Sequence, residues 1–475
     1  MRRALLLGLA VLLPTCARDP VTGKRELVLV GEQEEIAMGR QAAREVDAEM
    51  GIYSDQELND YVEALGLKMA AASERPALPW QFRVVDSPVV NAFALPGGFI
   101  YLTRGILAYV DNEAALMGVI GHEIGHVTAR HSVEQISRQQ LAGLGVGLGT
   151  IFFPEVRPFG DVLGGSLGLL FLKFGRDAER ESDRLGVRYS LEQGYDPREM
   201  AAFFAVLGKL GGEERNIPAW ASTHPDPEER EGAILAMLQR QEEGTLQVGE
   251  DRYKRAIEGL VFGENPREGF MQGRRFLHPE LKFQLEFPEG WRVQNTPRAV
   301  YAATRDGGAA IQLTASRVAT GTAPETHARS FFVSNRLEYG TGERLRAGPF
   351  SAYRAPFRGL TSSGEIVGDA GFLVDGNLVY ELIGMTRPAQ YRRYSLVFRD
   401  VLESFDRLRD RSALEIQPLR VRLFEVPETM RFDEALRRAG VDAEHFRDLS
   451  LMNQLEAADI VPQGTLLKIL ERGPA

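Results

Sequence analysis

Cysteine is almost absent from this sequence: its 475 residues include one, Cys16. A single cysteine excludes an internal disulfide and a structural zinc site built on several thiolates. Histidine is also scarce, with seven residues, so a bound metal must rest on a few histidines and on carboxylates. An excess of positive charge is lacking too, because the net charge is −10. That balance argues against nucleic acid as a partner.

The N-terminus lacks an apolar run long enough to span a bilayer. Residues 4–13 form a short apolar run after Arg2 and Arg3, which is typical of a secretory signal peptide. The run leads into Cys16, and this stretch resembles a bacterial lipobox, in which the cysteine is lipidated. The alternatives are a plain signal peptide with an incidental cysteine and an uncleaved anchor. We predict a signal peptide over residues 1–15 and a periplasmic protein anchored through Cys16, with Ala17 favouring the outer membrane.

The length and composition predict a multidomain globular protein. A chain of 475 residues is too long for one hydrophobic core, and two to four domains are expected. Apolar residues make up 44% and charged residues 26%, which is ordinary for a globular protein.

Three of the seven histidines lie within ten residues, in the stretch Gly121-His122-Glu123-Ile124-Gly125-His126 and at His131. On a helix, His122 and His126 leave the same face one turn apart, which suits two nitrogen ligands of a tetrahedral Zn²⁺. Glu123 lies next to them, where it can take a proton from an activated water.

The third histidine of this stretch, His131, is predicted not to be a ligand. It follows His126 by five residues and points about 140° away if the helix continues. The four residues between them contain no glycine that would let the chain turn. The third ligand must therefore come from elsewhere.

A charged run at residues 176–184 offers that ligand. Such a run is by default a solvated helix face. However, Glu179 and Asp183 are four residues apart on one face, where like charges repel unless a cation or an imidazole NH lies between them. Glu181 points away from both. We predict Glu179 as the carboxylate ligand and Asp183 as the group that orients a ligand histidine.

The elements before the motif are predicted from periodicity and capping patterns. Residues 32–50 indicate a helix, and Ser54 with Glu57 forms a capping box for a second one. Residues 80–85 alternate as in a strand. Asp111 or Asn112 is the expected cap of the helix that carries the motif.

Two further stretches each leave two interpretations open. Residues 91–102, with a Pro-Gly-Gly turn, form either an ordinary core hairpin or an edge strand that a peptide substrate joins. Residues 141–172 are apolar and rich in glycine. They form either a helical hairpin or mobile loop over the site, or a lid that faces a membrane or unfolded substrate.

The ordered set of these motifs resembles the zinc metallopeptidase family that includes HtpX and the CAAX prenyl endopeptidases, and within it the periplasmic BepA-like branch. The resemblance covers roughly residues 19–262 and includes the stretches 19–25, 91–98 and 223–225. It implies a gluzincin with a His, His, Glu zinc site in a mainly α (α+β) domain with a small sheet. The spanning helices of the integral-membrane members are absent, which argues against prenylated or membrane-embedded substrates.

The same resemblance assigns roles to His224 and Arg230. A histidine in a proline-rich loop before a helix capped by Asp226 is by default a surface or capping residue. In the BepA-like branch the matching histidine approaches the metal, and the matching arginine lies by the site. The implied roles are a regulatory metal contact and stabilisation of an oxyanion.

The C-terminal half resembles two other families. Residues 273–408 are similar to PsbP-type α+β domains, with a helix around 324–338 and a final one around 390–405. Residues 415–475 resemble a LysM module of βααβ order, a class that often binds peptidoglycan. The predicted boundaries are 16–262 for the peptidase, 273–408 and 415–475.

We therefore predict a zinc metalloendopeptidase that hydrolyses misfolded or misassembled envelope proteins, next to outer-membrane assembly machinery. The ligands are His122, His126 and Glu179, and Glu123 is the general base. The alternative is a periplasmic chaperone or assembly factor with a latent or structural metal site. A cell-wall hydrolase is suggested only by the LysM-like tail.

Overall fold

The structure is a computed structural model that describes residues 16–18, 20–23, 25–27, 29–141, 174–210, 220, 223–239, 245–361 and 364–474. The glycine-rich segment 141–172 lies outside these residues except for its first position. No helix among the described residues is long and apolar enough to cross a membrane.

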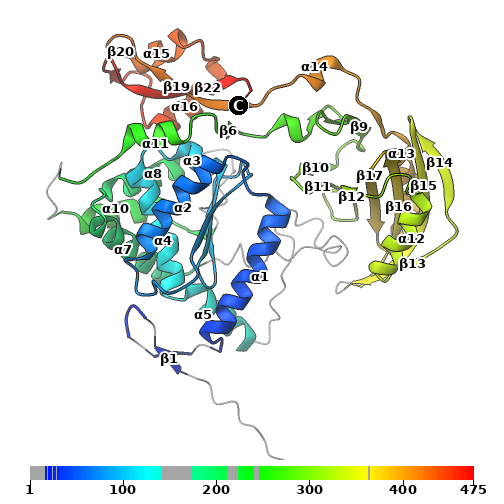
Figure 1. Cartoon of the computed structure of the whole chain (residues 1–475), viewed down its shortest axis with the longest axis horizontal. Helices are drawn as coiled ribbons and strands as arrows, with labels where there is room; N and C mark the ends of the chain where they lie inside the picture. Colours follow the sequence, from blue (N-terminus) through cyan, green and yellow to red (C-terminus); the bar gives the residue numbers. More distant parts are fainter. Residues whose placement is uncertain are drawn as a thin grey trace, which may run out of the picture.

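The N-terminal segment (residues 16–262) is mainly helical around a small sheet (Figure 1). Its sheet has the order β3-β5-β4, with β3 parallel and β4 antiparallel to β5. The elements are β1 (Cys16–Arg18), β2 (Arg25–Leu27), α1 (Glu32–Met50), α2 (Gln56–Ala70), β3 (Gln81–Val85), β4 (Ala92–Leu95), β5 (Phe99–Thr103), α3 (Arg104–Tyr109), α4 (Glu113–Thr128), α5 (His131–Leu141), α7 (Arg176–Glu192), α8 (Arg198–Leu210), α10 (Pro227–Met237), α11 (Glu250–Ala256) and β6 (Val261–Phe262).

The predicted helix at 32–50, the strand at 80–85 and the hairpin at 91–102 are confirmed by α1, β3 and the β4–β5 pair. Strand β4 lies at the edge of the sheet, so the strand-addition interpretation stays a prediction. The predicted cap of α2 was wrong by one residue. Asp55, and not Ser54, accepts the N–H of Leu58 at 3.0 Å, because the helix begins at Gln56.

Helix α4, which carries the histidine motif, lies at the centre of the N-terminal segment. All its residues are buried, so it lacks the polar stripe of a surface helix. Its N-terminus is capped by Asn112, which accepts the N–H of Ala115 at 2.8 Å and confirms one of the two predicted caps. Helices α2, α7 and α8 pack around it (Figure 1). Rigid packing on all sides suits a helix that must hold two ligands in place.

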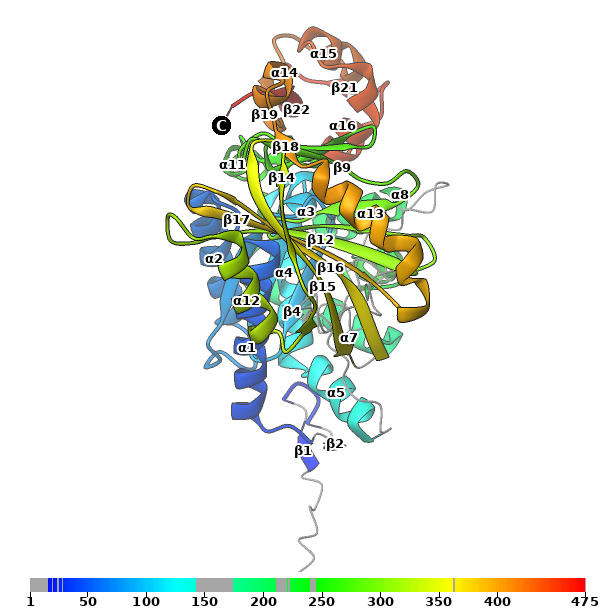
Figure 2. The same cartoon turned by 90° about the vertical axis from the view of Figure 1, so that its right-hand side faces the viewer.

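The middle segment is an α+β arrangement around an eight-stranded antiparallel sheet (Figure 2). The sheet order is β10-β11-β12-β17-β16-β15-β13, with β14 paired to β15, and a smaller sheet has the order β18-β9-β8-β7. The elements are η3 (Pro266–Glu268), β7 (Phe270–Gln272), β8 (Arg275–His278), β9 (Phe283–Glu286), β10 (Arg292–Asn295), β11 (Ala299–Ala303), β12 (Ala309–Arg317), α12 (Pro324–Ser334), β13 (Glu338–Tyr339), β14 (Glu343–Ala347), β15 (Phe350–Thr361), β16 (Gly364–Asp375), β17 (Leu378–Thr386), η4 (Pro388–Gln390), α13 (Tyr391–Glu403), β18 (Asp406–Arg407) and α14 (Arg411–Leu414).

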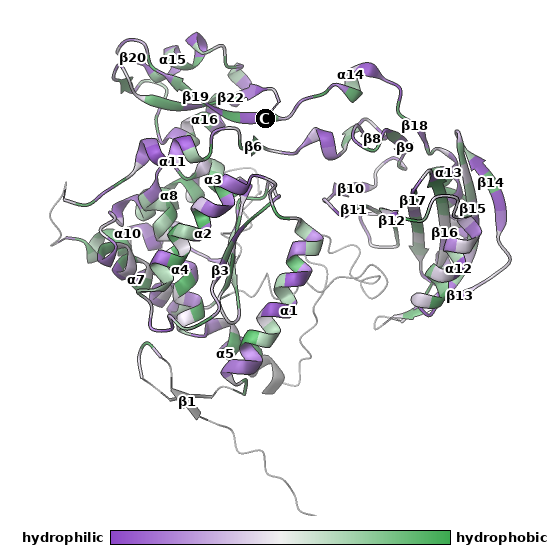
Figure 3. Ribbon diagram, in the orientation of Figure 1, coloured by the Kyte–Doolittle hydropathy of each residue, from purple (hydrophilic) through white to green (hydrophobic). Residues whose placement is uncertain are grey.

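Both helices predicted for this segment are present, as α12 and α13, and they cover opposite faces of the large sheet. Successive strand residues alternate between two hydrophobic clusters: Leu382 packs on the side of α13 and Ile383 on the side of α12. This period of two buries both faces of the central strands. In Figure 3 β16 and β17 are accordingly hydrophobic, whereas β14 is largely hydrophilic.

The C-terminal module (residues 415–475) has the predicted order of two long strands around two helices. Strands β19 and β22 pair antiparallel. The elements are β19 (Leu419–Glu425), β20 (Met430–Arg431), α15 (Phe432–Arg438), η5 (Ala443–His445), α16 (Phe446–Asn453), β21 (Ile460–Val461) and β22 (Leu466–Arg472). Its LysM character and its binding of peptidoglycan stay predictions.

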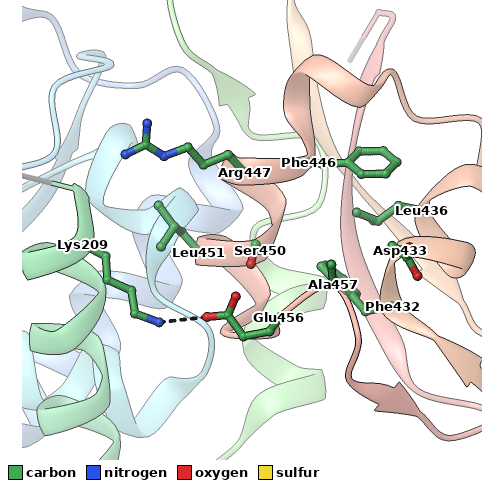
Figure 4. A pocket seen from close by; sticks show the side chains of 10 residues that line it. All are labelled: Lys209, Phe432, Asp433, Leu436, Phe446, Arg447, Ser450, Leu451, Glu456 and Ala457. Atoms are coloured by element: carbon green, nitrogen blue, oxygen red, sulfur yellow. Dashed lines mark hydrogen bonds and ion pairs between the residues drawn. The ribbon is translucent and has the colours of Figure 1, made fainter. Parts of the chain in front are cut away.

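The C-terminal module shares a sheet and a hydrophobic core with the N-terminal segment. Strand β19 pairs on its other side with β6, and one cluster of buried residues includes both parts. At the junction, Lys209 of α8 makes an ion pair of 3.1 Å with Glu456 beside a hollow of about 430 Å³ (Figure 4). The C-terminal module therefore packs directly on the N-terminal segment, and the predicted domain boundaries stay predictions.

A buried lysine of the C-terminal module holds the chain just before α4. The Nζ of Lys468 lies 2.7 Å from the carbonyl oxygen of Val110 and 3.2 Å from Asp111 Oδ1. Lys254 approaches the same carboxylate at 3.6 Å. Burial lowers the pKa of Lys468 to about 8, against the opposing pull of Asp111. The module thus contacts the residues just before the helix that carries the histidines.

Candidate active site

Close packing of α4 on α7 sets the geometry of the site. A Cβ on Gly125 would lie 3.0 Å from the Cα of Ser182, and a Cβ on Gly121 would lie 3.1 Å from the Cα of Gly186. Glycine at these positions lets the two helix backbones approach more closely than larger residues would allow. The acidic face of α7 therefore reaches the histidine face of α4.

The structure brings together four buried residues, which we call the donor cluster: His122, His126, Glu179 and His224. One ligand atom from each lies within 4.8 Å of the others. The Nε2 atoms of His122 and His126 are 3.0 Å apart. The Glu179 oxygens lie 3.6 Å from the first and 3.5 Å from the second. Ligands about 2.0–2.2 Å from a tetrahedral zinc lie about 3.3–3.6 Å apart. The two Glu179 distances match this range and the distance between the histidine nitrogens is slightly shorter, so the donor types and their spacing suit the ion.

Glu123 lies beside the donor cluster with both carboxylate oxygens buried. Neither oxygen has a hydrogen-bond partner among the described residues, and His224 Nε2 is 3.6 Å from Oε1. A buried carboxylate without a partner is costly, which indicates that water or another ligand belongs at this position.

Asp183 contacts the ring of His122 on the side away from the donor cluster. Its Oδ1 lies 3.0 Å from Nδ1, and Arg230 donates two hydrogen bonds to the carboxylate at 2.8 and 2.6 Å. Burial acts to raise the pKa of Asp183, but the Arg230 guanidinium and His122 hold it well below its ordinary value. The aspartate is therefore ionised and can accept the Nδ1–H of His122.

Arg230 is the cation between the two acidic residues of α7. Its Nη1 forms an ion pair of 3.1 Å with Glu179 Oε2. The geometry of this contact is not that of a hydrogen bond, and Nη1 has no hydrogen-bond partner among the described residues. The guanidinium lies over the rings of Phe204 and Trp220, at 4.3 and 4.6 Å. Burial acts to raise the pKa of Glu179, but His224, His122 and Arg230 together lower it. The predicted need for a cation between Glu179 and Asp183 is thus met by a residue far along the chain.

His224 is buried, so it is not the surface residue that its loop position suggests by default. Its Nδ1 lies 3.1 Å from each Glu179 oxygen and 3.2 Å from His122 Nε2. The ring stacks on Trp220 at 4.8 Å. Asp226 is the N-cap residue of α10, as predicted, but its side chain makes no hydrogen bond to the helix. This residue precedes α10 with φ of 61°, and its carboxylate pairs with Arg176 at 3.0 Å.

The chain before His131 does not follow the predicted path. The chain turns at Arg130, which has φ of 59°, so α4 ends and α5 begins at His131. The argument that the chain cannot turn without glycine was wrong. His131 is outside the donor cluster, yet its Nδ1 lies 3.0 Å from the Nδ1 of His126. The ring of Phe174 stacks on His126 at a centroid distance of 4.1 Å. This contact was not predicted, because Phe174 is not part of any recognisable sequence motif.

Comparison with known proteins finds similarity over the segment that carries this site. Residues 56–238 match the model of Peptidase family M48. The chain is 32% identical over 233 residues to the beta-barrel assembly-enhancing protease of Yersinia pestis, which is 46% of this chain and 47% of that protein. It is 34% identical over 195 residues to the mitochondrial metalloendopeptidase OMA1 of Arabidopsis thaliana, or 40% and 38% of the two chains.

The chain therefore spans less than half the length of either of these curated relatives. One solved structure, cyanobacterial PsbP (CyanoP) from Synechocystis sp. PCC 6803, shares 15% identity. It covers 28% of this chain and 89% of that one, with a TM-score of 0.24. The PsbP-like character of the middle segment therefore stays a prediction.

Proposed function

We propose that this chain, which carries a peptidase family M48 domain over residues 56–238, is a zinc-dependent metalloendopeptidase. The observation that carries the proposal is the donor cluster together with the carboxylate of Glu123 beside it, which has no hydrogen-bond partner among the described residues. His122, His126 and Glu179 hold the metal. A zinc ion bound there polarises the scissile carbonyl and lowers the pKa of water towards about 7.

Glu123 moves the proton in this reaction. A carboxylate oxygen of Glu123 accepts the proton of the attacking water and then returns it to the leaving nitrogen. Asp183 and Arg230 hold the His122 ring in place from behind. The Nη1 of Arg230 lies 3.1 Å from Glu179 and makes no hydrogen bond among the described residues, so it would donate one to the negative charge that develops on the carbonyl oxygen.

His224 is proposed as a regulatory residue of the same site. Together with it, the donor cluster has four protein ligands, the number found in closed structural zinc sites, whereas catalytic sites keep one position open. A His224 side chain that leaves the cluster would open that position.

Removal of the metal tests the proposal. We expect the purified chain to contain one zinc ion and to cleave an unfolded protein such as reduced, denatured casein. A chelator should stop cleavage, and added zinc should restore it, because Glu123 alone cannot activate water at neutral pH. Zinc is measured by elemental analysis and cleavage by gel. Cleavage that persists in metal-free protein would contradict the proposal.

The substrate class is proposed as misfolded or misassembled cell-envelope proteins. The name of the Yersinia pestis relative connects that protein with the assembly of β-barrels. An assembly or chaperone role without proteolysis is the second candidate, because the four-ligand donor cluster also fits a latent or structural metal site.

The location is proposed as the periplasmic side of an outer membrane, with an anchor on Cys16. The short apolar run before this cysteine supports the proposal. We expect cells that express the chain to incorporate labelled fatty acid into it, and Cys16→Ala to abolish the label. Equal labelling of both proteins, or of neither, would contradict lipidation at this residue.

A further inference from the structure

His131 contacts the ring of a proposed metal ligand from outside the donor cluster. It is buried at the start of α5. Its Nδ1 lies 3.0 Å from His126 Nδ1 and 3.4 Å from Ser182 Oγ, and its Nε2 lies 3.4 Å from Glu181 Oε2. Both ring nitrogens of His131 therefore have partners. The partner of its Nδ1 is the Nδ1 of His126, the ring nitrogen that does not face the donor cluster.

The position of His126 determines where its proton lies. Its Nε2 faces the donor cluster, 3.0 Å from His122 Nε2 and 3.5 Å from Glu179. A nitrogen that holds a cation cannot carry a proton, so neutral His126 carries its proton on Nδ1. That N–H points at His131 Nδ1, which must then be the acceptor. The proton of His131 is left on Nε2, facing Glu181.

The rings of the two α4 histidines are thus held by the same kind of contact. His122 donates from Nδ1 to Asp183, and the carboxylate is held by Arg230. His126 donates from Nδ1 to His131, which in turn donates to Glu181. Metal-bound histidines usually donate their second N–H to such a partner, which fixes the tautomer and the ring orientation.

We propose that His131 is a positioning residue: it accepts the Nδ1–H of His126 and keeps the Nε2 of that ring facing the metal, with Glu181 as its own anchor. The proposal rests on the proposed function, because it requires a metal at the donor cluster.

The test uses two substitutions of similar size. The amide oxygen of an asparagine lies about where Nδ1 of histidine lies, whereas the polar group of glutamine lies near Nε2. We expect His131→Asn, which keeps an acceptor for the Nδ1–H of His126 but loses the contact with Glu181, to lower zinc affinity clearly less than His131→Gln does. His131→Gln should lower it about 10–100-fold, the usual effect of losing such a partner. The full-length protein is titrated against a zinc chelator, and Glu134→Gln, on the surface of α5, is the matched control.

A second readout is the visible absorption of the Co²⁺-loaded protein, which reports the orientation of the ligands. The spectrum of His131→Asn should stay closer to that of the wild type than the spectrum of His131→Gln. If His131→Gln does not fold, Glu181→Leu removes the anchor without touching the turn at Arg130, and it should lower zinc affinity in the same direction.

Equal zinc affinities in the Asn and Gln variants, whether both wild-type or both reduced, would overturn the role of His131. If His131→Gln does not fold, wild-type zinc affinity in Glu181→Leu would overturn it as well. A wild-type protein that binds no zinc would instead overturn the proposed function.

Discussion

Replacing Glu123 with glutamine is expected to lower kcat/KM on an unfolded protein by about 10²–10⁴-fold, the range that general acid–base catalysis contributes. An amide cannot accept the proton of the attacking water. The substitution keeps the size of the side chain, whose two oxygens are buried and unbonded among the described residues. Zinc content should stay at the wild-type level, because Glu123 is outside the donor cluster. Cleavage rates and elemental analysis of the same preparations measure both.

The same variant separates the two candidate functions. If the chain acts as a chaperone or assembly factor, Glu123→Gln will keep full function when cells are challenged in an envelope-stress assay. If it acts as a protease, the variant will fail although the protein is folded and loaded with zinc. Glu134→Gln makes the same chemical change on α5, outside the site, and should behave as the wild type.

Replacing Glu179 with glutamine should remove the metal itself. A neutral amide is a far poorer zinc ligand than a carboxylate, and the proposed site has three ligands. We expect zinc affinity to fall about 100-fold or more, because loss of groups that merely support a ligand already costs 10–100-fold. Proteolysis should fall with zinc occupancy, and chelator titration measures the affinity.

Two variants serve as controls for Glu179. Asp177→Asn removes an exposed carboxylate from the same helix and should leave zinc binding unchanged. His224→Ala should also retain zinc, because three ligands remain, and its proteolysis should change if His224 regulates the site. Wild-type zinc occupancy in Glu179→Gln would remove this residue from the site.

Much of the site could be predicted because its spacing is local. A helix places His122 and His126 on one face, and likewise Glu179 and Asp183, whatever the rest of the chain does. Helices and the hairpin followed from such local patterns, whereas the α+β class of the middle segment was predicted from a resemblance to PsbP-type domains. The error at the start of α2 has a local cause, because Ser54 and Asp55 are near-equal candidates for the cap of this helix.

His131 could not be placed from the sequence, because the turn before it depends on distant contacts. Arg130 adopts a left-handed conformation that a non-glycine residue rarely takes. Its side chain donates to Glu35 at 2.9 Å and to the carbonyl of Val30 at 2.9 Å. Bonds to residues 95 and 100 positions away stabilise the strained turn, and no local pattern reveals them.

The sequence alone determined that His122 and His126 lie on one helix face, as do Glu179 and Asp183, because a helix repeats every 3.6 residues. The tertiary structure alone decided what surrounds them. It brought Arg230 between Glu179 and Asp183, His131 against His126, and Lys468 of the C-terminal module against Asp111. Burial makes these charged and polar contacts strong, and burial depends on how distant segments pack, which local periodicity does not specify.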